Sequence, residues 1–207
     1  KVAQHVAFLT RHPEVSVTYN NRWDLQYSST NIRNYVRVPA TVGLADLVVG
    51  FPFCPSDMVV RREQAYAVGL FDESFLHFSE DMDFNCRLAL AGCQFVGIDR
   101  CLNFRRFHSG RVIRNPRQRL EAALRSLNNT FSDERTPPEV HAVKGRAYSD
   151  HYLVWAIEAL RQENTETGLE WLRQSAAWRP AVVEGHPNDI TTFLVYDTVH
   201  DDAEDHA

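Results

Sequence analysis

Three carboxylates stand together in Glu80-Asp81-Met82-Asp83, directly after Ser79. Serine is a favoured N-cap residue, and acidic side chains in a first helical turn interact favourably with the helix dipole. A carboxylate kept ionised in this way can take a proton from a substrate hydroxyl and so act as a general base. The run therefore has two interpretations that stay open: a catalytic carboxylate, or acids that serve only to start a helix.

The basic residues are almost all arginines. Lys1 and Lys144 are the only lysines, and eight arginines lie between Arg100 and Arg125, where Glu121 is the only acid. This segment carries a charge of +7 and the rest of the chain −12, within a net charge of −5. Guanidinium groups bind phosphate and carboxylate through two parallel hydrogen bonds. The segment predicts an anion-facing strip, with an ordinary arginine-rich surface as the alternative.

The composition narrows the class of protein. A chain of 207 residues, 44% hydrophobic and 24% charged, is typical of a globular protein with one or two domains. No apolar run approaches the ~18 residues of a membrane span, and no secretory signal is visible. The cysteines at 54, 86, 93 and 101 form no Cys-x-x-Cys pair, so free thiols in a reducing compartment are expected. We expect a cytoplasmic protein, with a peripheral position at the inner face of a membrane as an alternative.

Helix and strand patterns alternate over the first 110 residues, which implies an α/β domain. Phe84, Leu88 and Ala91 are expected to form the apolar face of one helix. Residues 20–50 show no sustained period and are predicted to be a long loop, a kind of segment that is often functional. The expected helices cover 2–11, 61–69 and 79–92, and the expected strands cover 15–19, 57–60, 94–98 and 102–107.

Beyond Pro116 the pattern is helical. Apolar residues recur at spacings of three and four from Leu120 to Leu127, from Val140 to Leu160, and again over 167–178. The last two helices, with Gly168 and the stop at Arg179-Pro180, resemble one hairpin of the tetratricopeptide type. No second copy is visible at a ~34-residue period. Residues 190–196 are left open as helix or strand, and 200–207 are expected to be a solvated acidic tail.

An ordered set of short motifs runs through the first half of the chain. In order, the set comprises Val59-Val60-Arg61-Arg62, Gly69-Leu70-Phe71-Asp72-Glu73, Ser79-Glu80-Asp81-Met82-Asp83 and Phe104-Arg105-Arg106-Phe107-His108. The order and spacing closely resemble the second half of a family 2 glycosyltransferase with the GT-A fold. The resemblance covers about residues 1–113. It implies a GT-A-like mixed sheet (the nucleotide-diphospho-sugar transferase type) lacking its N-terminal half, followed by an α-helical C-terminal region over 114–199.

The resemblance also implies roles for single residues. Asp81 matches the general base that deprotonates the acceptor hydroxyl in an inverting displacement. His108 matches a position that contacts the divalent metal, Mn²⁺ or Mg²⁺, or the diphosphate, and a histidine that caps a strand end is the alternative. Arg87 is expected to be a structural ion-pair partner. The expected substrate contacts are Glu80, Arg105, Arg106, Arg111 and Trp23, whereas Phe51 and Phe53 are expected in the core.

Two departures from the family pattern define what this chain is expected to be. The nucleotide pocket and the Asp-x-Asp metal motif, which precede the first helix in the family, are not in this sequence. The Gln-x-x-Arg-Trp motif of processive synthases is missing too, so a single-transfer enzyme fits better. We therefore expect the acceptor-side half of a transferase, inactive alone, whose partners are a nucleotide-diphospho-sugar donor and a sugar, lipid-linked or protein acceptor.

Two other function classes remain as alternatives. The first is a non-catalytic, transferase-like module that binds a partner protein through its helical hairpin. The second is nucleic-acid binding through the arginine strip, which the negative net charge and the lack of a recognisable motif disfavour. We expect no nucleic-acid partner.

Overall fold

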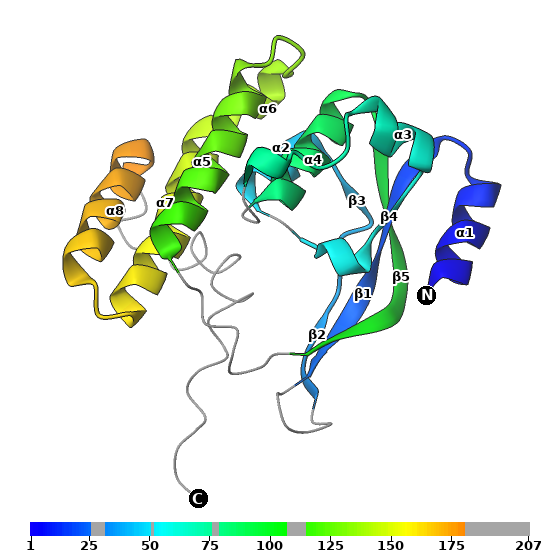
Figure 1. Cartoon of the computed structure of the whole chain (residues 1–207), viewed down its shortest axis with the longest axis horizontal. Coiled ribbons are helices and arrows are strands. Elements are labelled where there is room, and N and C mark those ends of the chain that lie inside the picture. Colours follow the sequence, from blue (N-terminus) through cyan, green and yellow to red (C-terminus); the bar gives the residue numbers. More distant parts are fainter. Residues whose placement is uncertain (26–31, 51, 76–78, 107–114, 181–207) are drawn as a thin grey trace, which may run out of the picture.

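The computed structural model describes residues 1–25, 32–50, 52–75, 79–106 and 115–180 (Figure 1). Helices and strands alternate up to residue 106 and helices alone follow, so the predicted α/β class is confirmed. The helices are α1 (Val2–Arg11), α2 (Leu44–Val49), α3 (Arg62–Ala67), α4 (Glu80–Leu90), α5 (Pro116–Ser132), α6 (Pro138–Ala142), α7 (Lys144–Arg161) and α8 (Thr165–Trp178). The strands are β1 (Val15–Leu25), β2 (Ile32–Val36), β3 (Thr41–Val42), β4 (Val59–Val60) and β5 (Gln94–Arg106), with short 3₁₀ turns at Pro55–Asp57 and Glu73–Phe75.

The sheet is mixed and is built around two long strands. β1 runs parallel to β5 along its whole length, while β2 and β4 pair with β1 in the antiparallel sense. β3 pairs antiparallel with β5 at the other edge, which gives the order β2-β1-β5-β3. Val15, Val17 and Tyr19 are buried, as expected for a β-branched and aromatic strand between paired neighbours.

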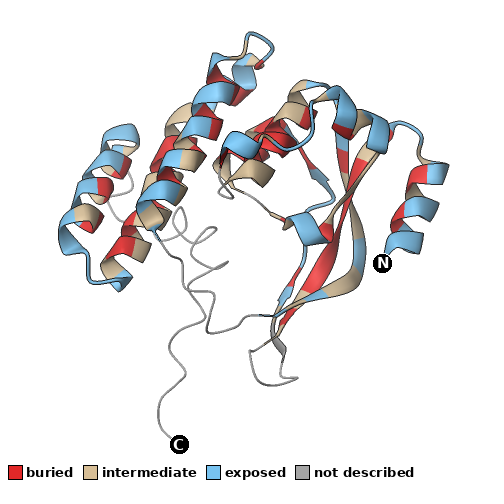
Figure 2. Cartoon of the chain, viewed as in Figure 1, coloured by how far each residue is buried: buried red, intermediate tan, exposed pale blue. Residues whose placement is uncertain are grey.

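Helices cover both sides of this sheet. Figure 1 shows α1 on one side and α2 with α4 on the other. One hydrophobic core joins the sheet to α2 and α4 and continues into α5, α6 and α7, where Leu127, Phe131 and Tyr148 belong to it. A smaller cluster around Leu120 and Trp171 joins α5, α7 and α8. Figure 2 shows the buried residues following this path from the sheet into the long helices.

The predicted pairing of two helices is confirmed by α7 packed against α8, but the helix predicted from Val140 to Leu160 is divided at Val143 into α6 and α7. Gly168 is required at the crossing, because a Cβ there would come within 2.5 Å of the Leu160 Cγ and 3.2 Å of the Ala156 carbonyl oxygen. Its identity as a tetratricopeptide unit stays a prediction. Among the described residues, no helix has both the length and the apolar character needed to cross a bilayer.

Several sequence expectations were wrong. The predicted loop over 20–50 contains the second half of β1 together with β2, β3 and α2. The strands predicted at 94–98 and 102–107 are one strand, β5, whose register against β1 shifts between Asn20 and Arg22 so that the polar residues near Asp99 are accommodated as a bulge. Ala91 is exposed, whereas Phe84 and Leu88 are buried as predicted. The segments 190–196 and 200–207 lie outside the described residues.

Candidate functional site

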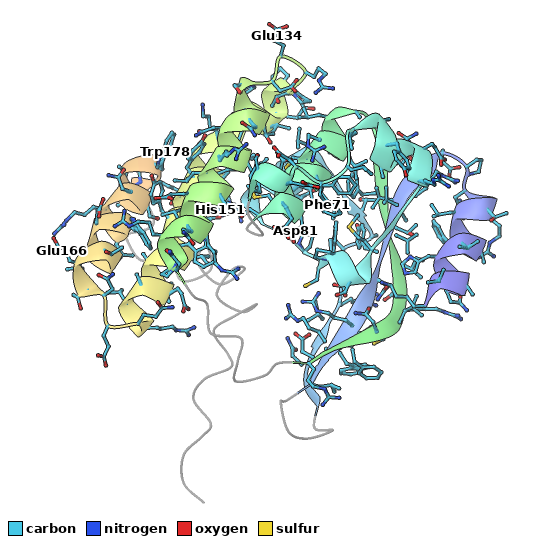
Figure 3. All side chains as sticks on the ribbon, viewed as in Figure 1. Phe71, Asp81, Glu134, His151, Glu166 and Trp178 are labelled. Atoms are coloured by element: carbon cyan, nitrogen blue, oxygen red, sulfur yellow. The ribbon has the colours of Figure 1, made fainter. Side chains whose placement is uncertain are left out.

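Asp81 occupies the first turn of α4. In the view of Figure 3 it lies between α7 and the sheet. Its Oδ1 atom accepts a hydrogen bond of 2.9 Å from the Met82 amide, and Asn85 Nδ2 donates to its main-chain carbonyl at 2.8 Å. Ser79, which precedes the helix, has a left-handed backbone with φ 58° and makes no side-chain cap bond, so its predicted capping role was wrong. A left-handed non-glycine residue is costly and is often found where a functional group must be positioned.

The surroundings of Asp81 favour its protonated form. Burial is the main cause that raises the pKa of this carboxyl, and repulsion from Glu80 adds to it. The Met82 amide and the distant charge of Arg119 on α5 act in the opposite direction. The position of Asp81 at a helix start was expected to keep its carboxyl ionised. The loss of solvation on burial has the larger effect on its pKa and favours the protonated form. A raised pKa makes a carboxylate a stronger base at neutral pH, which is the direction that general-base catalysis needs.

Asp83 is fixed in a structural interaction instead. Its Oδ2 lies 2.7 Å from Arg87 Nε, and Arg87 Nη2 donates to the Leu70 carbonyl at 2.7 Å. Arg87 Nη1 also donates to the Val68 carbonyl. Arg87 is therefore the ion-pair partner that the sequence predicted, and it ties α4 to the turn at Leu70, where the backbone is again left-handed. The neighbouring Glu80 is partly buried at the start of α4.

A buried network of charges lies where β1, β5 and the 3₁₀ turn Pro55–Asp57 meet. Arg22 Nε lies 3.1 Å from Asp24 Oδ1, and Arg22 Nη1 lies 2.7 Å from Asp57 Oδ2. Asn103 donates to Asp57 Oδ1 at 2.8 Å. Arg22, Asp24 and Asp57 are all buried, and such charges are tolerated only when they are paired and hydrogen-bonded. Sequence reasoning missed this network, although charged residues alternating at 22 and 24 next to a β-branched strand are a usable signal.

Arg105 belongs to the same network. Its Nε and Nη2 atoms donate to the two Asp24 oxygens at 3.0 and 2.8 Å, and its Nη1 lies 3.3 Å from Cys54 Sγ. This two-fold contact with Asp24 compensates the charge of Arg105, which the resemblance implied to be a substrate contact. Arg106 is exposed at the end of β5. His108 and Arg111 lie outside the described residues.

The other described arginines of the 100–125 segment contact different parts of the molecule. Arg100 on β5 bonds to Gln4 of α1 at 3.3 Å. On α5, Arg117 and Arg119 lie over the rings of Trp171 and Trp155, at 5.5 and 5.9 Å from the centroids. Arg125 lies 4.4 Å from the centroid of the Phe75 ring. The described arginines therefore do not form one continuous strip.

The aromatic residues also divide between core and surface. Phe53 is buried and stacks on Tyr19 at 4.4 Å between centroids, so its predicted place in the core is confirmed. Trp23 is partly exposed and lies against Tyr35 at 4.4 Å. Phe51 lies outside the described residues.

The described residues do not supply a metal site. No three of their histidine, cysteine, aspartate or glutamate side chains gather closely enough to hold an ion. Within Asp81-Met82-Asp83, the second carboxylate is committed to Arg87. The four cysteines are free, as predicted, and Cys86 is fully buried in the core. The Mn²⁺ or Mg²⁺ that the resemblance implies, with His108 as its contact, stays a prediction.

A cavity of about 240 Å³ lies between α5, α7 and α8. Leu120, Leu124 and Trp171 form its apolar lining, and Arg117 and Glu170 bring charges of opposite sign. Burial, and then the charge of Glu170, raises the pKa of Tyr152, which also lines the cavity. The cavity gives these three helices a concave surface of mixed polarity.

The chain matches no protein-family model, and no curated protein matches it in sequence.

Proposed function

We propose that this chain is the acceptor-side part of an inverting glycosyltransferase with a GT-A-like sheet, in which Asp81 is the general base. The observation that carries the proposal is the position of Asp81, on the first turn of a helix pinned by Arg87, in an environment that raises its pKa. The mixed sheet with its parallel β1–β5 pair, and the ordered motifs that lead to Asp81, support the same assignment.

The proposed reaction is a single displacement at the anomeric carbon of a nucleotide-diphospho-sugar. The acceptor hydroxyl oxygen attacks this carbon while the Asp81 carboxylate takes the hydroxyl proton. The bond from the anomeric carbon to the diphosphate breaks, its electron pair leaves with the nucleotide diphosphate, and the configuration inverts. Glu80, on the same helical turn, is proposed to contact the acceptor.

The leaving diphosphate needs positive charge in this proposal. Arg106, which is exposed at the end of β5, and Arg111 are the proposed contacts, whereas the structure commits Arg105 to Asp24. Trp23 is proposed to stack on a sugar face. Metal dependence and the role of His108 are proposals that rest on the resemblance alone, and no step above is routed through a metal.

The experiment that tests the function compares Asp81→Asn with Glu80→Gln in a protein that carries the donor-binding half. Asp81→Asn keeps the shape and removes the basic oxygen, so transfer should fall ~10²-fold or more at nearly unchanged donor affinity. Glu80 points ~100° away around the helix, so Glu80→Gln should cost less. Near-parental turnover in folded Asp81→Asn would remove Asp81 from catalysis.

The second candidate is a non-catalytic module that binds a partner protein through its helical hairpin. The observation that favours it is the cavity between α5, α7 and α8, whose lining includes Trp171, Tyr152 and Arg117, residue types that are enriched at protein interfaces. This candidate predicts that Glu170→Ala weakens partner capture while Asp81→Asn leaves it unchanged. If the chain is part of a transferase, Asp81→Asn should instead lower sugar transfer and Glu170→Ala should leave it unchanged.

A further inference from the structure

The cavity between α5, α7 and α8 has an apolar floor. Leu120 of α5 and Trp171 of α8 are both buried, and Leu124 packs against the cluster that they form. The Arg117 guanidinium lies over the Trp171 ring, at 5.5 Å from its centroid, and borders the same cavity. With a volume of about 240 Å³, the cavity is smaller than the roughly 300–1,000 Å³ of drug-sized pockets, so it suits a small ligand.

Polar side chains surround this floor and have hydrogen-bonding capacity to spare. They are those of Arg117, Tyr152, Glu170 and Gln174. Within the part of the chain that the structure describes, none of these four side chains forms an ion pair or a hydrogen bond with another residue. The charge of Glu170 raises the pKa of Tyr152, which shows that these two side chains, from α8 and α7, lie close together at the cavity. The polar rim is therefore able to bind a ligand without first breaking internal contacts.

The charges on the rim limit what can bind. Arg117 and Glu170 have opposite signs, and they form no ion pair with each other in the described part of the chain. A guanidinium binds a carboxylate through two parallel hydrogen bonds, and a carboxylate accepts hydrogen bonds from an ammonium group. A purely anionic ligand would meet Glu170 and a purely cationic one would meet Arg117, so charge complementarity favours a zwitterion.

The apolar floor adds a second requirement. Burying an aliphatic or aromatic group against it removes apolar surface from water and stabilises the complex. An α-amino acid with an apolar side chain carries a carboxylate, an ammonium group and such a side chain around one carbon atom. This class of small molecule therefore matches the charges, the floor and the volume of the cavity together.

We propose that the cavity between α5, α7 and α8 binds a free α-amino acid with an apolar side chain. The α-carboxylate pairs with Arg117 and the α-ammonium group with Glu170. The side chain of the ligand lies against Leu120, Leu124 and Trp171. The inference goes beyond the proposed transferase, which makes no use of the cavity, and it assigns to the cavity a smaller ligand than the partner protein of the second candidate.

The test is titration calorimetry of the whole chain with leucine, methionine and phenylalanine, and with glycine, which has no side chain to place on the floor. We expect binding of at least one of the three at millimolar or lower concentration, and weaker binding of glycine. Glu170→Gln removes the carboxylate and should weaken that binding about tenfold, as expected for the loss of one hydrogen bond between charged groups. Glu166→Gln is the matched control and should bind like the parent, because Glu166 is exposed on the same helix and does not line the cavity.

Analogues of the ligand separate the two charged contacts. For leucine, isocaproate lacks the ammonium group and isoamylamine lacks the carboxylate. Both analogues should bind the parent more weakly than leucine does, since each loses one of the two pairs. Glu170→Gln should not weaken the binding of isocaproate, because this acid has no ammonium group to pair with Glu170.

Three results would overturn the proposal. The first is no binding of any of the three amino acids at millimolar concentration. The second is binding that Glu170→Gln leaves unchanged, which would place the ligand elsewhere on the chain. The third is an analogue that binds as tightly as the amino acid, which would identify a site for carboxylates or for amines alone. Because neither transfer nor capture of a partner protein is measured, these results are independent of whether Asp81 acts as a base.

Discussion

Asp81 and Asp57 show how different surroundings compensate the charge of the same residue type to different extents. Asp57 is buried with an arginine, a backbone amide and an asparagine as partners, which keeps its charge compensated. Asp81 is mostly desolvated and accepts a single described hydrogen bond, and this raises its pKa. A general base gains stability when it takes a proton, and of the two carboxylates Asp81, whose pKa is raised, is the one to which we assign this role in the proposed function.

The raised pKa of Asp81 predicts a stability change with a definite sign. A carboxyl whose pKa is higher in the folded protein than the ordinary 3.8 stabilises the folded state at low pH, and this contribution is lost as the pH rises through the folded pKa. Asp81→Asn should therefore be more stable than the parent in urea unfolding at pH 7. The gain should shrink as the pH falls toward 4. A variant less stable than the parent at pH 7 would contradict the environment described for Asp81.

The buried network predicts a large loss where one partner is removed. Asp57→Asn leaves the Arg22 guanidinium without one of its two carboxylate partners, and breaking a buried ion pair costs ~3–5 kcal/mol of unfolding free energy. Asp99→Asn is the control, since its pair with Arg37 is exposed and such pairs contribute at most ~1 kcal/mol. Urea unfolding at pH 7 measures both. Equal losses in the two variants would show that burial does not set the strength of these pairs.

At the scale of elements, α4 is fixed at its start and again in its third turn. Its start follows a left-handed Ser79, and its third turn is tied by Arg87 to the turn at Val68 and Leu70. The sequence predicted α4, its stop at Gly92 and the Asp81 position, because an acidic first turn and an apolar face are local signals. The left-handed Ser79 could not be predicted, because it depends on where the preceding segment meets the helix.

Replacing Arg87 measures how much this tie contributes to the free energy of unfolding. Arg87→Met removes the partner of the nearly buried Asp83 and the donors to two carbonyls, so the unfolding free energy should fall by about 2–3 kcal/mol. Arg62→Met on the exposed face of α3 should stay within ~0.5 kcal/mol of the parent. Chemical denaturation measures the difference. A loss in Arg87→Met no larger than in Arg62→Met would mean that α4 is positioned by its apolar face alone.

Long-range pairing explains where sequence reasoning failed. Residues 20–50 have no local period because β1 beyond Asn20 carries the charged network on a strand that is buried by β5 and by the turn Pro55–Asp57. The sequence predicts two strands where the structure has β5, because the polar residues Asp99 and Arg100 interrupt the pattern. In the structure a bulge accommodates them within one strand. The pairing of Trp23 with Tyr35 and with Phe104 is equally invisible in the sequence, since these residues meet only through strand register.

At the scale of the whole molecule, one core joins the sheet to the long helices. Leu47 and Val48 of α2 and Phe84 of α4 share it with Phe131 of α5 and Tyr148 of α7. The chain was predicted to divide near residue 113 into a transferase part and a helical part, and that boundary stays a prediction. The shared core means that the two parts stabilise each other wherever the boundary lies.

Truncation tests this mutual support. A chain ending at residue 113 would expose the faces of α2 and α4 that pack on α5 and α7, so it should lose cooperative thermal unfolding or aggregate. The 207-residue chain should unfold in a transition that includes both parts. A truncated chain that keeps the same cooperative transition by circular dichroism and calorimetry would show that the helices contribute nothing to the sheet.

The pH dependence of transfer tests the central claim most directly. In a protein that carries the donor half, kcat/KM should fall as the pH drops through the pKa of Asp81, because only the ionised carboxylate can accept the hydroxyl proton. The midpoint of this acidic limb should lie above the ordinary value of 3.8, in the direction that burial and Glu80 impose. In Asp81→Asn the limb should vanish together with most of the activity. The same limb and near-parental turnover in Asp81→Asn would contradict the assignment of Asp81 as the general base.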